Sequence, residues 1–321
     1  MTSANRNQRR RSTVLGPIRW MAICAAIPLG CVGLAGLDGD YEVGDTSASG
    51  SGTGGSTSGT GGNTSSGGGT GGSTSSGNPP NLVNNGLIVR YFIDEAASGD
   101  WVTALEDSAP DPLPLALTYD AGNLSFTEIG GNRGLQWAAA QGSGRASTLV
   151  TNTKIQSALG GAGTATMELV VEVVDNGGHE ARLSHIGGGT EAGFFGLTWD
   201  GTFVRYWMNG AYDVGVWNWG LPQAGRVVLH LVVNIQASAS IDRVRLYSNG
   251  TPITPNTATI GPTPGTPFMA PSGKHYVLGN WEAGGMGFQG TLFYAAMYSS
   301  ALNQNEVSQN AGELLVNDDG F

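Results

Sequence analysis

The clearest hydrophobic pattern in the chain predicts two antiparallel strands between Arg226 and Ile253. The run at 227–235 is almost continuously apolar and rich in β-branched residues, which is typical of a strand buried on both faces. The next segment, 242–248, alternates between polar and apolar side chains, as a strand with two different faces does. Asn249-Gly250 then predicts a type I′ hairpin turn, because both central residues of that turn need positive φ.

The same patterns recur along the rest of the chain from Gly86 onward. Residues 164–175 alternate over a full strand length, and Asn209-Gly210 predicts a second hairpin within 203–217. Asn303 followed three residues later by Glu306 is a capping signature that predicts one short helix. No long amphipathic helix is evident, so we predict an all-β fold of two antiparallel sheets.

These patterns also resemble a known family. Val244 to Gly250 reads valine-arginine-leucine-tyrosine-serine-asparagine-glycine, which is similar to the central hairpin of laminin-G-like, concanavalin-A-like jelly-roll domains. Phe92 to Glu95 is similar to the opening of such domains, and Tyr298 to Val307 to their ending. The resemblance covers Leu87 to about Asn310. It implies a two-sheet antiparallel jelly-roll sandwich and a binding or adhesion module, with a glycan as the expected ligand.

The N-terminal segment 1–37 has the pattern of an export signal or membrane anchor. Five arginines precede an uncharged stretch from Trp20 to Leu37, which is the order of a basic region and an apolar region in such signals. Cys31 follows Leu29-Gly30 as a lipidated cysteine does in lipoprotein signals, so Cys31 is the expected lipidation site. Ordinary cleavage near 33–35 and an uncleaved anchor are the alternatives.

Residues 38–80 are expected to be a disordered linker. Thr46 to Asn78 consists almost entirely of Gly, Ser and Thr, a composition that cannot bury a core. The folded domain is expected to span 81–321, which is long enough for one large sandwich. Both cysteines, Cys24 and Cys31, precede the linker, so the domain must be stable without a disulfide.

The charge of the expected domain restricts its partners. From Asn81 onward ten basic residues face twenty-one acidic ones, a net charge of −11. Such a surface does not attract nucleic acids or anionic lipids. We therefore expect an extracellular glycan or a surface protein as the partner, no nucleic acid, and membrane contact only through an N-terminal lipid or anchor.

The resembled fold includes β-glucanases, enzymes that carry two glutamates on one face of one strand. The local carboxylate pair is Glu168 and Glu172, which are expected on the solvent face of one strand. Four residues apart on a strand, they would lie about 13 Å from each other, whereas glycosidase carboxylates are separated by about 5 to 9.5 Å. We therefore predict no catalytic residue. Paired carboxylates in one cleft would favour an enzyme instead.

The expected ligand site lies in loops. Trp219 and Trp281 fall in predicted loops, where large aromatic side chains gain little from the core and can stack on sugar rings. Asn280 and Glu282 flank Trp281. The resemblance implies that these two residues could also hold Ca²⁺, although calcium prefers six to eight oxygen ligands. Trp219, Trp281, Asn280 and Glu282 are therefore the expected binding residues.

The sequence as a whole indicates an exported protein, either held at the cell surface by its N-terminus or secreted. Its domain is expected to bind a carbohydrate without catalysing a reaction. The first alternative is a divergent glycosidase or lyase of the same fold. The second is a structural protein of the cell envelope.

Overall fold

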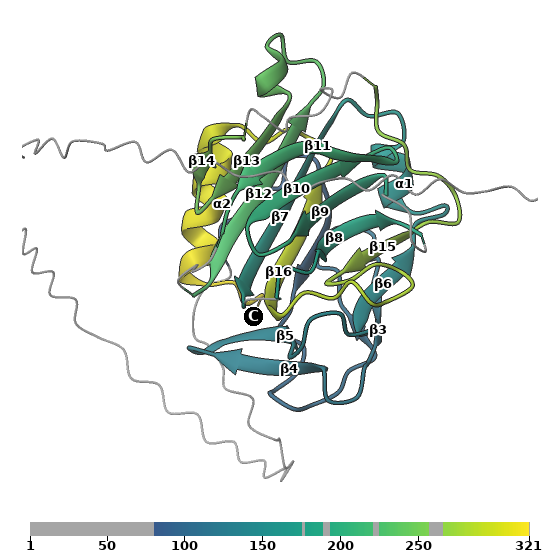
Figure 1. Ribbon diagram of the computed structural model, residues 1–321, viewed down its shortest axis with the longest axis vertical. Helices are drawn as coiled ribbons and strands as arrows, with labels where there is room; N and C mark the ends of the chain where they lie inside the picture. Colours follow the sequence, from purple (N-terminus) through teal and green to yellow (C-terminus); the bar gives the residue numbers. More distant parts are fainter. Residues whose placement is uncertain (1–79, 175–176, 189–192, 221–224, 257–265, 321) are drawn as a thin grey trace, which may run out of the picture. The chain divides into compact units, whose positions relative to one another are not determined.

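The computed structural model describes residues 80–320 except 175–176, 189–192, 221–224 and 257–265. Two antiparallel sheets pack face to face, with helix α2 against one of them (Figure 1). The predicted two-sheet sandwich is therefore confirmed. The signal segment, the linker and Cys31 lie outside the described residues. None of the described helices is long and apolar enough to cross a bilayer.

The first sheet, called sheet A, has the order β14-β13-β12-β7-β16-β5-β4, and β1 also pairs with β16. Its strands are β1 (Leu87–Phe92), β4 (Leu124–Ile129), β5 (Asn132–Trp137), β7 (Thr164–Val173), β12 (Val227–Asn234), β13 (Val244–Ser248), β14 (Thr251–Ile253) and β16 (Gly290–Tyr298).

The second sheet, called sheet B, has the order β11-β10-β9-β8-β15-β6-β3-β2. Its strands are β2 (Ala104–Leu105), β3 (Leu115–Thr118), β6 (Arg145–Leu149), β8 (Ala181–Gly187), β9 (Phe195–Trp199), β10 (Phe203–Met208), β11 (Ala211–Asn218) and β15 (His275–Leu278). Three short helical segments connect or cover the sheets: α1 (Lys154–Leu159), the 3₁₀ turn η1 (Ser240–Asp242) and α2 (Gln304–Val316).

Strand β12 shows why the apolar run is continuous. Leu229, Leu231 and Val233 point into the core between the two sheets. Val228 and Val232 point to the opposite face of sheet A, into a second apolar cluster. Both faces of the strand are thus buried, as the uninterrupted pattern predicts.

Both predicted hairpins are confirmed. Asn209 and Gly210 have φ angles of 52° and 80°, and Asn249 and Gly250 have 50° and 76°. The first pair joins β10 to β11 and the second joins β13 to β14. Each turn thus has positive φ at both central residues, as a type I′ turn requires.

Helix α2 begins as predicted but is longer than expected. The Asn303 side chain accepts from the backbone N–H of Glu306, and Glu306 bonds back to Asn303, which completes a capping box. The helix then continues for 13 residues. Val307, Ala311 and Leu314 form an apolar stripe that packs on the outer face of sheet A. Figure 1 shows the helix beside β12 to β14.

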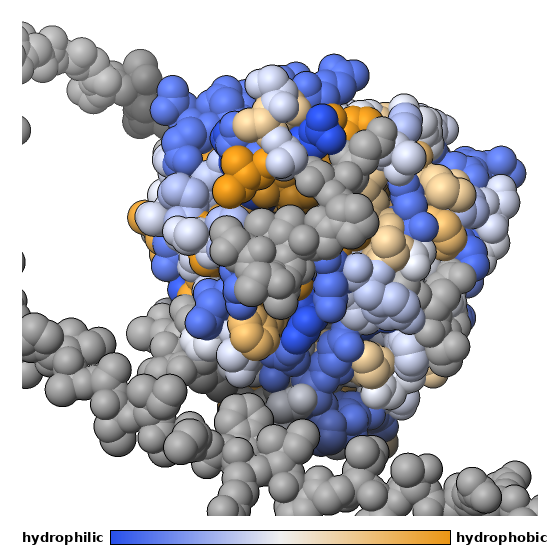
Figure 2. Space-filling view, turned by 45° about the horizontal axis from the view of Figure 1, so that its top comes forward, coloured by the Kyte–Doolittle hydropathy of each residue, from blue (hydrophilic) through white to orange (hydrophobic). Residues whose placement is uncertain are grey.

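The two clusters take up most of the large apolar side chains. In the view of Figure 2 the described surface is mostly hydrophilic, and hydrophobic side chains gather in small patches in the upper half of the picture. Among the described residues, only two large aromatic side chains are highly exposed: Trp101 at 60% and Tyr212 at 58%. Trp101 precedes β2 and Tyr212 lies on β11, the strands at the two edges of sheet B.

Candidate functional site

The structure corrects the expectation for Trp219. Its side chain is only 5% exposed and belongs to the core between the sheets. Trp219 directly follows β11, which ends at Asn218, and its backbone N–H donates to the carbonyl oxygen of Thr202 at 2.9 Å. The exposure expected for Trp219 was wrong, because its ring turns inward and packs against Trp199 with ring centroids 6.4 Å apart. Trp217 is buried between the sheets as well.

Asn280 uses its whole amide group inside the protein. Its Nδ2 donates to the carbonyl oxygens of Gly142 and Gly144 at 2.8 and 3.0 Å. Its Oδ1 accepts from the backbone N–H groups of Trp281 and Met286, both at 2.9 Å. With this side chain fully buried, Asn280 shapes the loop and has no hydrogen-bonding group left for a ligand or a metal ion.

Trp281 and Glu282 remain accessible on the same loop, since both are half-buried. Trp281 Nε1 donates to the carbonyl oxygen of Gly284, which fixes the indole ring. Within the described part of the chain, no three His, Cys, Asp or Glu side chains lie close enough together to hold a metal ion. Of the four expected binding residues, the structure thus leaves Trp281 and Glu282 at the surface.

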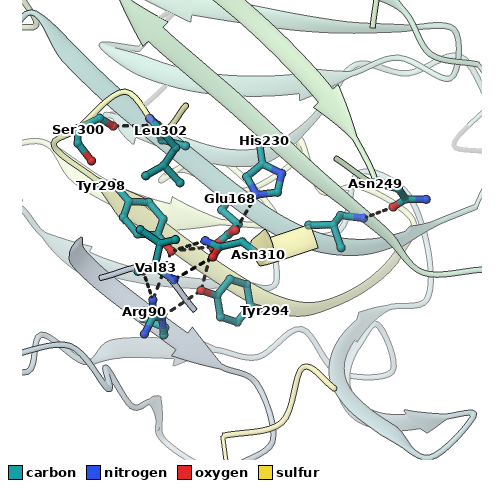
Figure 3. A network of polar contacts seen from close by, with 12 residues as sticks. Val83, Arg90, Glu168, His230, Asn249, Tyr294, Tyr298, Ser300, Leu302 and Asn310 are labelled. Carbon is teal, nitrogen blue, oxygen red and sulfur yellow. Dashed lines mark hydrogen bonds and ion pairs between the residues drawn. The ribbon is translucent and has the colours of Figure 1, made fainter. Parts of the chain in front are cut away.

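The pair Glu168 and Glu172 does not lie on a solvent face as expected. Glu168 is completely buried beneath α2, so the predicted solvent exposure was wrong for this residue. Figure 3 shows its partners converging on the carboxylate. His230 Nε2 donates to Oε1 at 2.7 Å, and the hydroxyls of Tyr294 and Tyr298 donate to Oε2 at 3.0 and 2.8 Å.

Arg90 extends this buried network toward the N-terminal segment. Its Nε donates to the Tyr294 hydroxyl at 3.1 Å, and its Nη2 to the carbonyl oxygen of Val83 at 2.8 Å. Asn310 of α2 donates to the Tyr298 hydroxyl and accepts from the Val83 N–H. The network therefore ties β1, β7, β12 and β16 to α2 and to the start of the domain. It is a structural element that no ligand can reach.

The pKa values in this network follow from burial and charge. Burial alone would raise the pKa of Glu168, but the adjacent His230 and the hydrogen bonds it receives hold that pKa below its ordinary value. Burial opposes the charge of Arg90, yet the phenol groups of Tyr294 and Tyr298 raise its pKa. Both groups are thus held in their charged forms.

A second arginine cluster lies on the outer face of sheet B. The Arg182 guanidinium carbon lies 3.9 Å from the centre of the Trp207 ring and 5.4 Å from that of Trp281. Tyr212 also contacts the Trp207 ring edge to face, with ring centroids 4.6 Å apart. We call Tyr212, Trp207, Arg182 and Trp281 the tryptophan–arginine row.

The small side chains of β9 allow the row to form. Arg182 is on β8 and Trp207 on β10, two strand spacings apart, or about 10 Å. Between them β9 presents only Gly196 and Thr198 on this face, paired with Trp207 and Arg182 respectively. The long Arg182 side chain therefore reaches across β9 to the indole ring.

A β-bulge adds His185 to the same face. The register between β8 and β9 shifts between Arg182 and Ser184, so residues three positions apart both point outward. Arg182 Nη1 lies 2.9 Å from His185 Nδ1. Burial, and then the neighbouring Arg182 charge, hold the pKa of His185 well below its ordinary value, so a neutral imidazole accepts from the guanidinium.

The row has a buried centre and accessible ends. Arg182 and Trp207 are 1% and 3% exposed, and burial lowers the pKa of Arg182 to about 10. Tyr212 at one end is largely exposed, and Trp281 at the other is half-buried. The two buried members therefore hold two accessible aromatic rings in place.

Polar groups surround the Tyr212 end of the row. The Asp213 carboxylate accepts from Arg205 Nη1 at 3.1 Å and from Trp207 Nε1 at 3.3 Å. Arg205 also bonds Asp200 through Nε and Nη2. The Asp213 side chain is still 43% exposed, so its carboxylate can accept further hydrogen bonds beside an aromatic ring.

A separate cavity of about 380 Å³ opens beside β1. It is lined by Phe92, Asp94, Glu95, Glu106, Asp107, Ser108 and Arg133. Asp107 is internally satisfied, because it accepts from three backbone N–H groups and forms an ion pair with Lys154 at 2.6 Å. Burial raises the pKa of Glu95 to about 7, although Oε1 accepts from the Glu106 N–H at 2.7 Å.

Sequence reasoning missed most of these residues. Trp207 and Tyr212 lie in the aromatic-rich segment 206–219. The alternation of side chains along β10 could not show which face of that strand would be covered. Arg182 and His185 carried no signal, because the bulge that aligns them breaks the two-residue period. The cavity combines residues from β1, β5 and the segment after β2, which no local pattern connects.

No protein-family model matches the sequence, and no curated protein matches it. Among solved structures, the chain is similar to a Trypanosoma rangeli sialidase in complex with 2,3-difluorosialic acid, with a TM-score of 0.50 and 16% identity over 74% of this chain and 34% of that chain. It is also similar to the receptor-binding domain of a botulinum neurotoxin C/D mosaic serotype, with a TM-score of 0.49 and 13% identity over 72% and 52% of the two chains.

A third similar structure is domain 4 of AbnA, a GH43 extracellular arabinanase from Geobacillus stearothermophilus, in complex with arabinotriose. Its TM-score is 0.46, with 16% identity over 70% of this chain and 98% of that chain. The match to the sialidase spans about a third of the sialidase chain. At this level of identity the likeness shows the fold alone.

Proposed function

We propose that this protein is a carbohydrate-binding module and that the tryptophan–arginine row is its glycan contact. The observation that carries this proposal is the arrangement of the row, in which buried Trp207 and Arg182 support the accessible rings of Tyr212 and Trp281. Aromatic faces stack on sugar rings, and nearby carboxylates accept hydrogen bonds from sugar hydroxyls. The structural likeness to a sialidase concerns the fold alone and supports none of the residues in the proposed site.

Rigidity is the physical advantage of the row. A surface aromatic side chain normally loses rotamer freedom when a ligand binds, which costs roughly 0.5 to 1.5 kcal/mol for each side chain. Trp281 is already fixed by its hydrogen bond to Gly284, and Tyr212 by its contact with Trp207. Both rings are therefore preorganised, and more of the stacking energy contributes to affinity.

Binding to a panel of polysaccharides tests the proposal. The full-length protein should bind at least one of a β-glucan, xylan, arabinan, chitin and pectin. Tyr212→Ala and Trp281→Ala should each weaken binding by about five- to tenfold, because one aromatic contact is worth about 1 kcal/mol. Ile241→Ala is the matched control, since Ile241 is an exposed apolar residue on η1 that does not belong to the row. A wild-type protein that binds none of the panel contradicts the proposal.

We also propose that the protein is exported and held at the cell surface, because its N-terminal pattern supports a lipoprotein signal ending at Cys31. Weak sites gain affinity when many tethered copies meet one polymer. Cys31→Ala should move the protein from the membrane fraction to the soluble fraction and leave its melting temperature unchanged. Unchanged membrane association would show that lipidation is not the tether.

A divergent glycosidase is the alternative function. Glu168 cannot take part, because it is buried in the network beneath α2. Such an enzyme would have to use the cavity beside β1, where Glu95 has a raised pKa and Glu106 lies nearby. Release of reducing ends from a polysaccharide by the wild type, abolished in Glu95→Gln, would favour this alternative.

A further inference from the structure

The cavity beside β1 is accompanied by an exposed aromatic stack. Trp101 packs on Tyr119 with ring centroids 4.2 Å apart, yet 60% of its surface is exposed. The Tyr119 hydroxyl donates to the carbonyl oxygen of Val102 at 2.9 Å and accepts from the Val102 N–H at 3.1 Å. Two hydrogen bonds to one peptide segment therefore fix the ring that supports Trp101.

This stack and the cavity are built partly from the same chain segment. Burial raises the pKa of the Tyr119 hydroxyl, and the neighbouring Glu95 carboxylate raises it further. Glu95 lines the cavity, and Glu106, another lining residue, directly follows β2 on the same segment as Trp101. An aromatic platform and a cavity with polar walls are thus held by one segment, 94–108.

The cavity has the size and lining of a site for a small polar ligand. Its volume of about 380 Å³ falls within the range of ligand pockets, about 300 to 1,000 Å³. Phe92 supplies an apolar wall, Ser108 a hydroxyl and Arg133 a cation, and Glu95 Oε2 is buried with no hydrogen-bond partner among the described residues. These groups suit the carbon face and the hydroxyls of a sugar ring.

The two sites lie at different places along sheet B. The tryptophan–arginine row extends over β8 to β11. Trp101 precedes β2 and Tyr119 follows β3, the two strands at the opposite edge of the same sheet. Four strand spacings, or roughly 19 Å, separate β8 from β2, which leaves room for a separate ligand at each site.

We propose that the cavity beside β1, together with Trp101, is a second saccharide site for neutral sugars, so that each domain cross-links two glycan strands. The proposal extends the glycan binding assigned to the row and needs that site as its second contact. Neutral sugars are specified because Asp94, Glu95 and Glu106 in the walls repel a uronate or another acidic sugar.

Stoichiometry provides the direct test. Calorimetric titration of the full-length protein with cellohexaose, xylohexaose and arabinohexaose should show two bound molecules per chain for at least one of them. The cavity variant Trp101→Ala/Glu95→Gln should reduce this number to one, and so should the row variant Tyr212→Ala/Trp281→Ala, because the loss of two contacts weakens a site by about 25- to 100-fold. The protein with all four changes should bind none. Asp111→Asn, at an exposed acid outside the cavity lining, is the matched control.

Cross-linking is the functional readout. Wild-type protein should precipitate the soluble polymer of the same sugar, whereas either single-site variant should bind it without precipitating it. Oligogalacturonate should not compete at the cavity. A stoichiometry of one that only the row variant abolishes would overturn the second site and leave the row intact. A stoichiometry of one that only the cavity variant abolishes would instead refute the row. Precipitation that survives in the cavity variant would overturn cross-linking through the cavity.

Discussion

The domain contains two buried arginines among aromatic side chains, and their surroundings differ. Arg90 bonds Tyr294, Tyr298 and the carbonyl oxygen of Val83 in a network that is covered by α2. Arg182 packs between Trp207 and Trp281 on the outer face of sheet B, and the row that it joins ends in accessible rings. The first cluster is enclosed by the protein, while the second displays aromatic surface to solvent.

The shifts in pKa express the same difference. The pKa of Arg90 is raised, because neighbouring phenol groups outweigh the opposing effect of burial. The pKa of Arg182 is lowered to about 10, because burial dominates over the attraction of Glu180. Perturbed pKa values occur at functional sites and in structural networks alike, so exposure separates the two clusters. The Glu168 network is enclosed, whereas the row ends in the accessible rings on which the proposed recognition depends.

The largest expected effect is on stability, from Glu168→Gln. This change leaves His230, Tyr294 and Tyr298 without the carboxylate that accepts their hydrogen bonds in a fully buried site, which typically costs about 3 to 5 kcal/mol. Urea unfolding at pH 7 measures it. Glu172→Gln, on the same strand and half-buried, should cost under about 1 kcal/mol. Equal losses in the two variants would contradict a special role for the network.

The two Asn-Gly hairpins provide the next contrast. Valine in a left-handed conformation costs about 1 to 2 kcal/mol, so Gly210→Val and Gly250→Val should both destabilise the domain. A Cβ at Gly250 would also lie 3.3 Å from Ser308 Cα of α2, whereas Gly210 faces open space. Gly250→Val should therefore lower the melting temperature further. The same melting temperature in both variants would refute close packing of α2 on the hairpin.

The pH dependence of stability should distinguish two carboxylates. The pKa of Glu168 is lowered on folding, so its stabilisation is present above its unfolded value near 4.5 and is lost as pH falls. The pKa of Glu95 is raised to about 7, so its contribution is present below pH 4.5 and is lost as pH rises toward 7.

Glu95→Gln isolates the second of these effects. The neutral amide cannot ionise, so the variant should lose less stability than the wild type between pH 5 and pH 8. We expect a difference on the order of 1 kcal/mol, measured by urea unfolding at the two pH values. Identical pH profiles would mean that the carboxyl group of Glu95 is not buried against the cavity wall.

The smallest expected effect on stability is from Tyr212→Ala. Tyr212 is mostly exposed, and such surface changes usually alter the free energy of unfolding by less than about 0.5 kcal/mol. Glycan affinity should nevertheless fall by about five- to tenfold. A variant that loses stability in proportion to affinity would indicate that the row is structural, like the Glu168 network.

Local patterns predicted the local parts of this fold. The Asn-Gly turns, the doubly buried strand β12 and the capping box of α2 depend on neighbouring residues, and all three are confirmed. The length of α2 was underestimated, because its stripe of Val307, Ala311 and Leu314 is meaningful only once a sheet face needs cover.

The sites depend on contacts that sequence patterns do not record. Trp281 was predicted as a surface aromatic residue and is accessible, but Trp219, which directly follows β11, turns its ring into the core against Trp199. Arg182 reaches Trp207 across β9, whose residues on that face are Gly196 and Thr198, and a bulge in β8 places His185 beside Arg182. Burial of Glu168 likewise follows from the position of α2, more than 130 residues away along the chain.

The most direct measurement follows the indole N–H signals of the protein by NMR as a bound oligosaccharide is titrated. The signals of Trp281, at the end of the row, and of Trp101, beside the cavity, should shift at the same concentrations that saturate binding. The signals of the core residues Trp137 and Trp219 should stay in place, because both rings are buried between the sheets. Binding without a shift of Trp281 would contradict the assignment of the row as the glycan contact.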